Sequence, residues 1–391
     1  MNAAESERDF CGSFDPSWCE FGDEARARAR GDQGTVSMAM PTQALGLGPL
    51  FWEVDMPIQL ATWSRPRRAR SALIWSLMAL AGFASASGDA TAQKLSGRTI
   101  TIIVPYTPGS GPDMVARTIG EEIQQRWGQT VITDNKPGAS GNIGAQAVAR
   151  ATPDGHTLLV TASPFTQNLS LFKNVPYDPV KSFTPIIQAA VGPMALAVHP
   201  SVPATSAQEF VGHVRARPGQ VNYGSTGVGT PHHLAMELFK LTARADLMHI
   251  PHKDMGGALA NLVGGHVSAM FSSLQVVFPP AQDRRIRLLG VASKQRVAAA
   301  PELPTLAEQG WPDFEADVWY GMLAPAGMPP DIVAKYNATV NEILCTPQVV
   351  ERLAKPGLVA VGGSPDEFAR FIAADIVKWR TVVKEAGIGP E

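Results

Sequence analysis

The sequence predicts an α/β protein of two lobes, each a parallel-rich sheet covered by helices. From Thr99 onward, short uncharged β-branched runs alternate with helical patterns and are joined by short turns, a pattern typical of parallel sheets. Three of these turns are rich in glycine, and each follows a predicted strand. Two extended stretches, around Ile186 and Ala316, are suited to cross from one lobe to the other.

The composition excludes several classes of protein. The chain has 391 residues, of which 45% are hydrophobic and 17% are charged, as in globular rather than disordered proteins. This length suggests about two domains. The formal net charge of -2 creates no general attraction to nucleic acid or to anionic lipid, so we expect no nucleic-acid partner.

The first 92 residues differ from the rest of the chain. Residues 1–55 show no sustained apolar periodicity. A basic cluster at 65–70, an uncharged apolar run at 72–86 and a series of small residues then follow, which is the layout of a secretory signal peptide. A membrane anchor that is retained is the alternative, although the apolar run is short for a bilayer.

We therefore interpret residues 56–92 as a signal peptide region that ends near Ala86 or Ala92. Residues 1–55 are then a disordered extension, or a misassigned start that precedes translation from Met56. After such a cleavage Cys345 is the one cysteine left, so the fold needs no disulfide. We interpret Cys345 as a buried structural thiol rather than a nucleophile.

We assign residues 93–195 and 316–391 to the first lobe and residues 196–315 to the second. The first lobe opens on a run of β-branched residues that Pro105 stops. In chain order, its patterns predict a strand at 99–104, a helix at 114–127, a strand at 130–133, a helix at 143–150, a strand at 156–161, an irregular segment at 171–183 and an extended stretch at 186–198.

The second lobe continues the same alternation. Its first helix opens on Ser206 and Glu209, which are spaced as a capping box. The remaining patterns predict helices at 206–216, 231–241 and 256–263 and strands at 221–223, 247–250, 267–272 and 286–292, with a short helix between the last two strands. A returning strand at 316–324 and closing helices at 330–344 and 366–385 complete the prediction.

The glycine turns are the candidate site. A strand that leads through a glycine turn into a helix leaves several backbone N–H groups without partners, and these groups can bind an anion. Hydroxyl side chains accompany all three turns, which suits a carboxylate held without lysine or arginine. The simpler interpretation of the first turn is an ordinary strand-to-helix connection in which Asp113 stabilises the helix start.

No motif for catalysis or metal binding is convincing. The G-x-S-x-G, G-x-G-x-x-G and P-loop patterns are absent, so we expect no enzyme and no cofactor. We also expect no metal site, because His232 and His233 point apart on a helix. We interpret His232 as a polar residue near a helix start, and the other histidines of this region, His249, His252 and His266, together with His233, as surface or turn residues.

Five motifs in order resemble a known family. They are PYTPGSGPD at 105–113, NKPGASGNIG at 135–144, PDGHTL at 153–158, PYDP at 176–179 with FTPI at 183–186, and STGVGT at 225–230 with HL at 233–234. Together they are similar to the substrate-binding proteins of tripartite tricarboxylate transporters, the Bug family. The resemblance runs from about Thr99 to the C-terminus.

The resemblance implies a periplasmic receptor of the type II two-lobed binding-protein fold. Such a receptor closes over a small carboxylate ligand and delivers it to the membrane permease subunits of a tripartite transporter; we expect a monomer. It implies that residues 107–113 grip the carboxylate from one lobe and residues 225–230 from the other. The full set of candidate ligand-binding residues is Tyr106, Thr107, Pro108, Gly109, Ser110, Gly111, Asp113, Ala139, Ser140, Ser163, Ser225, Thr226, Gly227, Thr230, His232 and Ser272.

Three departures from the family pattern bear on the ligand. Ser110 stands where the family usually has glycine, and His252 stands in place of a common tyrosine. Ser272 stands where the family strand often ends in aspartate. An aspartate there could meet a ligand amine or hydroxyl, so its loss favours a plain organic acid over an amino acid. Two other functions stay open: a sensor-type receptor for the same ligand, and a secreted α/β enzyme that uses the serine- and threonine-rich turns.

Overall fold

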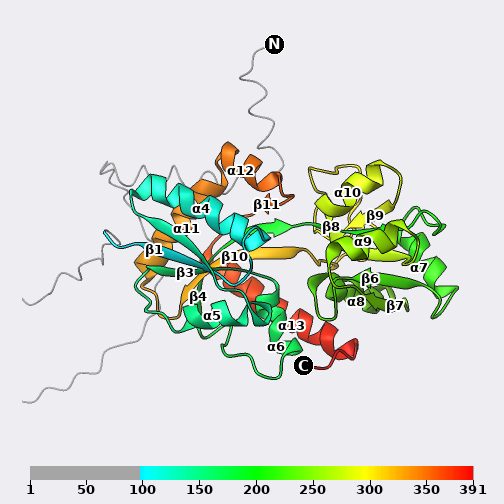
Figure 1. Cartoon of the computed structure of the whole chain (residues 1–391), viewed down its shortest axis with the longest axis horizontal. Helices are drawn as coiled ribbons and strands as arrows, with labels where there is room; N and C mark the ends of the chain where they lie inside the picture. The colour runs from blue at the N-terminus through cyan, green and yellow to red at the C-terminus, as the bar shows by residue number, and fades with distance from the viewer. Residues whose placement is uncertain (1–96, 391) are drawn as a thin grey trace, which may run out of the picture. The chain divides into compact units, whose positions relative to one another are not determined.

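The computed structural model describes residues 97–390, which build two mixed β-sheets with helices packed on them (Figure 1). The interpretations of residues 1–55 and 56–92 lie outside the described residues. No helix within 97–390 combines the length and the apolar character needed to cross a membrane.

The first sheet has the strand order β11-β4-β10-β3-β1-β2. Strand β1 pairs in parallel with both β2 and β3, whereas β10 runs antiparallel to β3 and β4, and β11 antiparallel to β4. Parallel neighbours end at the same edge, so the turns after β1, β2 and β3 meet there. The strands are β1 (Ile100–Val104), β2 (Val131–Asn135), β3 (Thr157–Ala162), β4 (Phe183–Gly192), β10 (Val318–Pro325) and β11 (Val359–Ala360).

Helices cover both faces of this sheet. Ile102 and Val104 of β1 pack in one apolar cluster, and Ile103 packs in another with Phe165 and Trp319. Burial on both faces explains why this strand is a continuous apolar run. The helices of this part are α4 (Gly111–Trp127), the short turn η2 (Ala139–Gly141), α5 (Asn142–Ala149), α6 (Pro164–Leu171), α11 (Pro330–Leu344), α12 (Pro347–Ala354) and α13 (Pro365–Glu385).

The second sheet has the order β7-β6-β8-β5-β9. Strand β6 pairs in parallel with β7 and β8, so their following turns share one edge, as in the first sheet. Its elements are β5 (Met194–Val198), α7 (Ala207–Arg215), β6 (Asn222–Ser225), α8 (Pro231–Ala243), β7 (Met248–Pro251), α9 (Met255–Val263), β8 (Ala269–Ser273), α10 (Leu274–Gln282) and β9 (Arg287–Val291).

The predicted order of strands and helices is confirmed for most of the chain, with a few differences. The extended stretch at 186–198 is two strands, β4 and β5, because Pro193 separates them. Helices α6 and α12 and strand β11 were not expected. Cys345 ends α11 and is exposed, so the interpretation of a buried thiol is wrong.

Two chain segments connect the sheets, and they are bonded to each other. One runs from β4 through Pro193 into β5, and the other leads into β10. Met194 N donates to Asp317 Oδ1 at 3.0 Å, and Gly192 pairs with Val318. A carboxylate therefore joins the two connections at the point where any movement of one sheet against the other must bend the chain.

Burial raises the pKa of Asp317 to about 7. The hydrogen bond from Met194 N lowers this pKa, but burial has the larger effect. A raised carboxyl pKa means that the folded state binds a proton more readily than the unfolded state. The contribution of Asp317 to the free energy of unfolding therefore falls as the pH rises from about 4 through 7. Since Asp317 is partly exposed, we expect a total loss of about 1–2 kcal/mol.

The variant Asp317→Asn isolates this effect, because asparagine can still accept from Met194 N and does not titrate. Urea unfolding of both proteins at several pH values measures the difference. The wild type should lose stability relative to the variant between pH 5 and 7.5 and show no further change between pH 8 and 9. If the difference in free energy of unfolding between the two proteins is the same at every pH, Asp317 has an ordinary carboxyl pKa.

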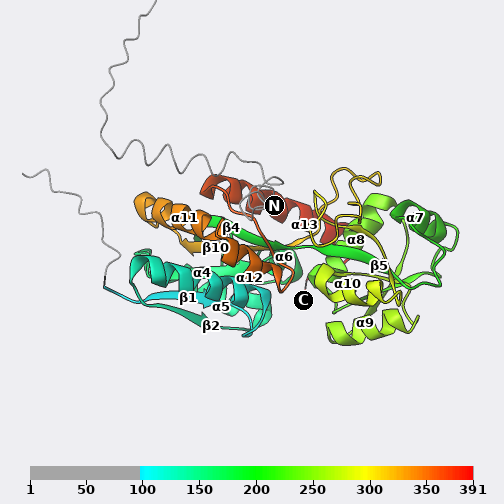
Figure 2. The same ribbon diagram turned by 90° about the horizontal axis from the view of Figure 1, so that it is seen from above.

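Helix α13 contributes to both apolar cores. It runs from the first sheet towards the second (Figure 2). Its first half, with Phe368 and Ile372, packs on the first sheet, and its last turns, with Trp379 and Val383, pack with the core of the second. The buried carboxylate of Asp375 accepts from the side chains of Thr166, Trp319 and Trp379 at 2.7–3.0 Å. This network ties α6, β10 and α13 together.

Candidate functional site

The first glycine turn, residues 105–113, is shaped by Asp113. Its carboxylate is 2% exposed and accepts from Gly109 N at 2.9 Å, from Arg117 Nε at 3.0 Å and from Asn135 Nδ2 at 2.9 Å. Burial raises the pKa of this carboxyl, but the hydrogen bonds from Arg117, Gly109 and Asn135 outweigh burial and hold the pKa below its usual value. Asp113 therefore holds the turn in shape and points its oxygens into the protein.

Two tyrosines pack against the glycines of this edge. A Cβ on Gly111 would lie 2.7 Å from the ring of Tyr320, and one on Gly141 would lie 3.1 Å from the hydroxyl of Tyr106. The hydroxyls of Tyr106 and Ser110 are buried and have no hydrogen-bond partner among residues 97–390. Buried hydroxyls are rarely left without a partner, so these two are unusual polar groups at this edge.

The second glycine turn is strained. Ala139 and Ser140 have φ of 47° and 52°, between Gly138 at 132° and Gly141 at 95°. Two consecutive non-glycine residues with positive φ cost energy, and such strain is concentrated at functional sites. Asn168 on α6 supports the turn, since its Nδ2 donates to Ser140 O at 3.0 Å. Ser163, after β3, is buried, and its Oγ accepts from Trp319 N at 3.0 Å.

The third glycine turn, residues 225–230, is the second-lobe loop. Thr226 Oγ1 lies 3.0 Å from His232 Nδ1, and Thr230 Oγ1 donates to Gly227 O at 2.8 Å. Ser225 is fully buried, and its Oγ accepts from Gly227 N at 3.1 Å. The hydroxyls predicted to touch a ligand are therefore partly used to fold the loop itself.

Backbone amides without an acceptor among residues 97–390 remain at all three turns. Nine backbone N–H groups at the turns donate to no acceptor within the described part of the chain, whereas neighbouring N–H groups do. The amides in question are those of Thr107, Gly111 and Asp113 at the first turn, Ala139 and Ser140 at the second, and Thr226, Val228, His232 and His233 at the third.

Ser272 differs from the other predicted site residues. It is fully buried in β8, and its Oγ donates to Met255 Sδ at 3.2 Å. The structure thus brings Tyr106, Thr107, Pro108, Gly109, Ser110, Gly111, Asp113, Ala139, Ser140 and Ser163 to the carboxyl edge of β1, β2 and β3, and Ser225, Thr226, Gly227, Thr230 and His232 to that of β6. Ser272 lies at the carboxyl end of β8, next to the same edge, but its side chain is buried against Met255.

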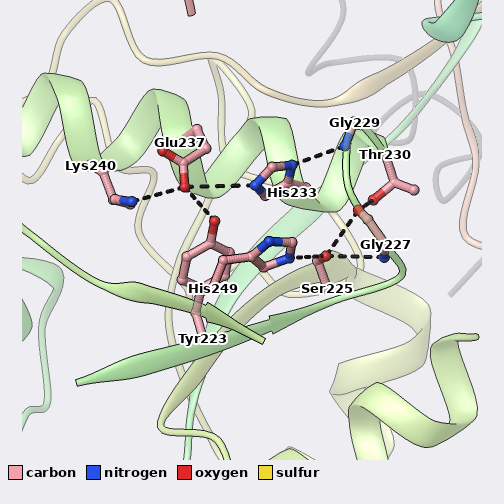
Figure 3. A network of polar contacts seen from close by, with 9 residues as sticks. All are labelled: Tyr223, Ser225, Gly227, Gly229, Thr230, His233, Glu237, Lys240 and His249. Atoms are coloured by element: carbon pink, nitrogen blue, oxygen red, sulfur yellow. Dashed lines mark hydrogen bonds and ion pairs between the residues drawn. The ribbon is translucent and has the colours of Figure 1, made fainter. Parts of the chain in front are cut away.

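A histidine network lies beside the second-lobe loop (Figure 3), and the sequence pattern did not predict it. His233 is 4% exposed, and its ring stacks on His249 with centroids 3.9 Å apart. The interpretation of His233 as a surface or turn residue is therefore wrong. His249 Nε2 lies 2.6 Å from Ser225 Oγ, and His233 Nδ1 accepts from Gly229 N at 3.0 Å. A single sequence shows no signal that would bring His249 beside His233.

Burial lowers the pKa of three imidazoles at this loop, so His232, His233 and His249 are neutral near pH 7. Burial lowers the pKa of His232 to about 4 and that of His249 to about 4. Burial, with repulsion from His249 and Lys240, lowers the pKa of His233 to about 3. Among the described residues, no three His, Cys, Asp or Glu side chains are grouped as a metal site would require.

Comparisons with known proteins agree on one family. The family model for the tripartite tricarboxylate transporter family receptor matches residues 115–388. Protein BugT of Bordetella pertussis is 35% identical over 318 residues, which cover 81% of this chain and 97% of that protein.

Solved structures give the same result. A protein of R. palustris solved with adipate is 34% identical, with a TM-score of 0.64, and the match covers 76% of this chain and 100% of that one. MatC from Rhodopseudomonas palustris, solved with bound malate, is 31% identical, with a TM-score of 0.60, and the match covers 74% and 99%. A TctC solute binding protein from Polaromonas is 27% identical, with a TM-score of 0.68, and the match covers 74% and 99%. The chain shares the two-lobed fold of these proteins, as the sequence predicts.

Proposed function

Because this chain belongs to the tripartite tricarboxylate transporter receptor family, we propose that it captures a small organic carboxylate between its lobes and delivers it to the permease of such a transporter. The observation that carries the proposal is the set of free backbone amides at the carboxyl edges of both sheets. Amides at turns and helix starts bind anions without a paired cation.

The surroundings of these amides favour a carboxylate over a phosphate ester. Arg117, next to the first turn, is already bonded to Asp113 and to Asn135 Oδ1. The polar side chains at the second-lobe loop are hydroxyls and neutral imidazoles. A dianionic phosphate is usually matched by arginine or lysine, whereas hydroxyl and amide donors suffice for a carboxylate.

The ligand class follows from the relatives and from Ser272. Two relatives hold adipate and malate, and both are dicarboxylates without an amine. In this chain Ser272 supplies no carboxylate that could pair with a ligand amine. We propose a plain organic acid of this kind, bound by residues 105–113 and 139–140 from the first lobe and by residues 225–232 from the second.

The same proposal covers the location and the path of the ligand. The signal peptide layout of residues 56–92 supports export to the periplasm, where the monomeric receptor would meet the permease subunits.

The serine–histidine pair of Ser225 and His249 is the feature that an enzyme would use. Ser225 is fully buried and bonded to Gly227, so this hydroxyl serves the loop.

A thermal shift screen tests the proposal. The full chain is mixed with mono-, di- and tricarboxylates and with aromatic acids, including adipate and malate. A bound acid at a hundredfold its Kd should add about 2.7 kcal/mol to the free energy of unfolding, and inorganic phosphate at the same concentration should add much less. A screen in which no acid raises the melting temperature would contradict the proposed function.

A further inference from the structure

A stack of three rings lies beside the second-lobe loop (Figure 3). His233 from α8 lies on His249 from β7, and His249 lies on Tyr223 from β6, with centroids 4.9 Å apart. The stack therefore joins the helix that follows the loop to the strand that precedes it and to the neighbouring strand. Packing on both sides of His249 leaves the rings little freedom to turn.

The His233 ring has a defined proton arrangement. Gly229 N donates to its Nδ1 at 3.0 Å, so Nδ1 carries the lone pair and Nε2 carries the proton. Nε2 faces Glu237 Oε1 at 3.8 Å, and this oxygen also accepts from Lys240 Nζ at 2.9 Å. The Glu237 carboxylate favours the His233 tautomer with the proton on Nε2, which leaves Nδ1 able to accept from Gly229 N.

We infer that His233 is a positioning residue of the second-lobe loop: it turns the Gly229 amide inward and thereby keeps the neighbouring amides free for the ligand. Ser225 and Thr230 fix Gly227 from within the loop, and His233 fixes Gly229 from the helix. The amides of Thr226, Val228 and His232 then stay without internal partners. This inference rests on the proposed function, since it takes the loop as a ligand contact.

The burial of the network explains why a histidine can do this over a wide pH range. Glu237 is 5% exposed, and Tyr223 OH donates to the same carboxylate. A protonated His233 could not accept from Gly229 N, and it would repel His249 in the stack. The groups that face His233 are Glu237 and Lys240 on its own helix, and Tyr223 and His249 on the two strands.

Two variants separate positioning from simple packing. His233→Asn places a carbonyl oxygen near the position of Nδ1 but loses the ring, whereas His233→Phe keeps a ring and loses the acceptor. If His233 acts by positioning, the Asn variant should bind adipate or malate within about threefold of wild type. The Phe variant should bind at least about tenfold more weakly, because the Gly229 amide loses its acceptor and the loop changes shape. If His233 only fills space, the Phe variant should bind more tightly than the Asn variant, and the inference is overturned.

A second readout needs no ligand. Hydrogen exchange of the Gly229 amide, followed by NMR in the full chain, should be slow in wild type and in the Asn variant and fast in the Phe variant. The changes His213→Asn and His213→Phe, on the partly exposed α7, are controls that should alter neither exchange nor affinity. Slow exchange of Gly229 in the Phe variant would overturn the inference. If wild type binds no acid, the proposed function fails, and the exchange result still decides whether His233 holds Gly229.

Discussion

Gly144→Ala should weaken acid binding at least about tenfold, because only a residue without a side chain lets the first and second turns pack this closely against it. A Cβ at this position would lie 2.8 Å from Pro105 Cα and 2.9 Å from Lys136 O. Both atoms belong to the backbone, so no side chain can move aside. Overpacking of this kind costs about 1–3 kcal/mol, which exceeds the gain of about 1 kcal/mol that alanine brings to a helix.

The displacement should reach the ligand, since Pro105 opens the first turn and Lys136 opens the second. Urea unfolding measures the loss of stability, and titration with the bound acid measures the loss of affinity. Gly212→Ala is the matched control, because nothing lies within 4 Å of a Cβ on this helical glycine. The control should stabilise the protein by up to about 1 kcal/mol and leave affinity unchanged. If Gly144→Ala binds the acid as tightly as wild type, these turns do not form the ligand site.

Asp113→Asn should destabilise the protein by about 1–3 kcal/mol and weaken binding, because it disturbs the support of the first turn. An asparagine amide must turn an N–H group towards Arg117 or Gly109, both of which are donors. Arg117 is partly exposed and can be hydrated in the variant, which keeps the loss below that of a fully buried pair.

The pH dependence of this variant has a definite sign. The pKa of Asp113 is lowered in the folded state, so its contribution is present above the usual carboxyl pKa of about 4 and disappears as the pH falls below it. The gap in stability between wild type and Asp113→Asn should therefore shrink in acid. The exposed Asp134, paired with Lys136 at 3.3 Å, is the control, and Asp134→Asn should change stability by less than about 0.5 kcal/mol. Equal losses in the two variants would contradict the role of Asp113.

Local pattern predicted much of the fold. The strand at 99–104 was predicted from an uncharged run of β-branched residues that Pro105 stops, and the structure has β1 there, with apolar clusters on both of its faces. The helix predicted at 330–344 has these same bounds in the structure, where Pro330 begins it and Thr346-Pro347 follows it. Ser206 was expected to cap its helix with Glu209, and its side chain does accept from Glu209 N. The Glu209 carboxylate bonds to Thr205 instead, so half of the expected capping box is replaced.

The contacts that shape the site depend on tertiary packing and could not be predicted. Tyr320 lies against Gly111 although they are far apart in the sequence, and His249 reaches Ser225 and His233 only because β7 pairs with β6. Asp375 looks like an ordinary helix-surface carboxylate, yet it is buried with three donors from three elements. The sequence pattern locates the turns, whereas the side chains that hold them come from distant segments.

The claim that the turns bind a carboxylate is tested most directly by calorimetric titration with one acid and its neutral diamide. The full chain is titrated with adipate and adipamide, or with the strongest acid of the screen and its amide, under the same conditions. The two ligands have nearly the same size and shape, and they differ in charge. We expect saturable binding of the acid and at least about tenfold weaker binding of the diamide, since each lost charge-assisted hydrogen bond costs more than about 1.4 kcal/mol. Equal affinity for the acid and the diamide would contradict carboxylate recognition by the free amides.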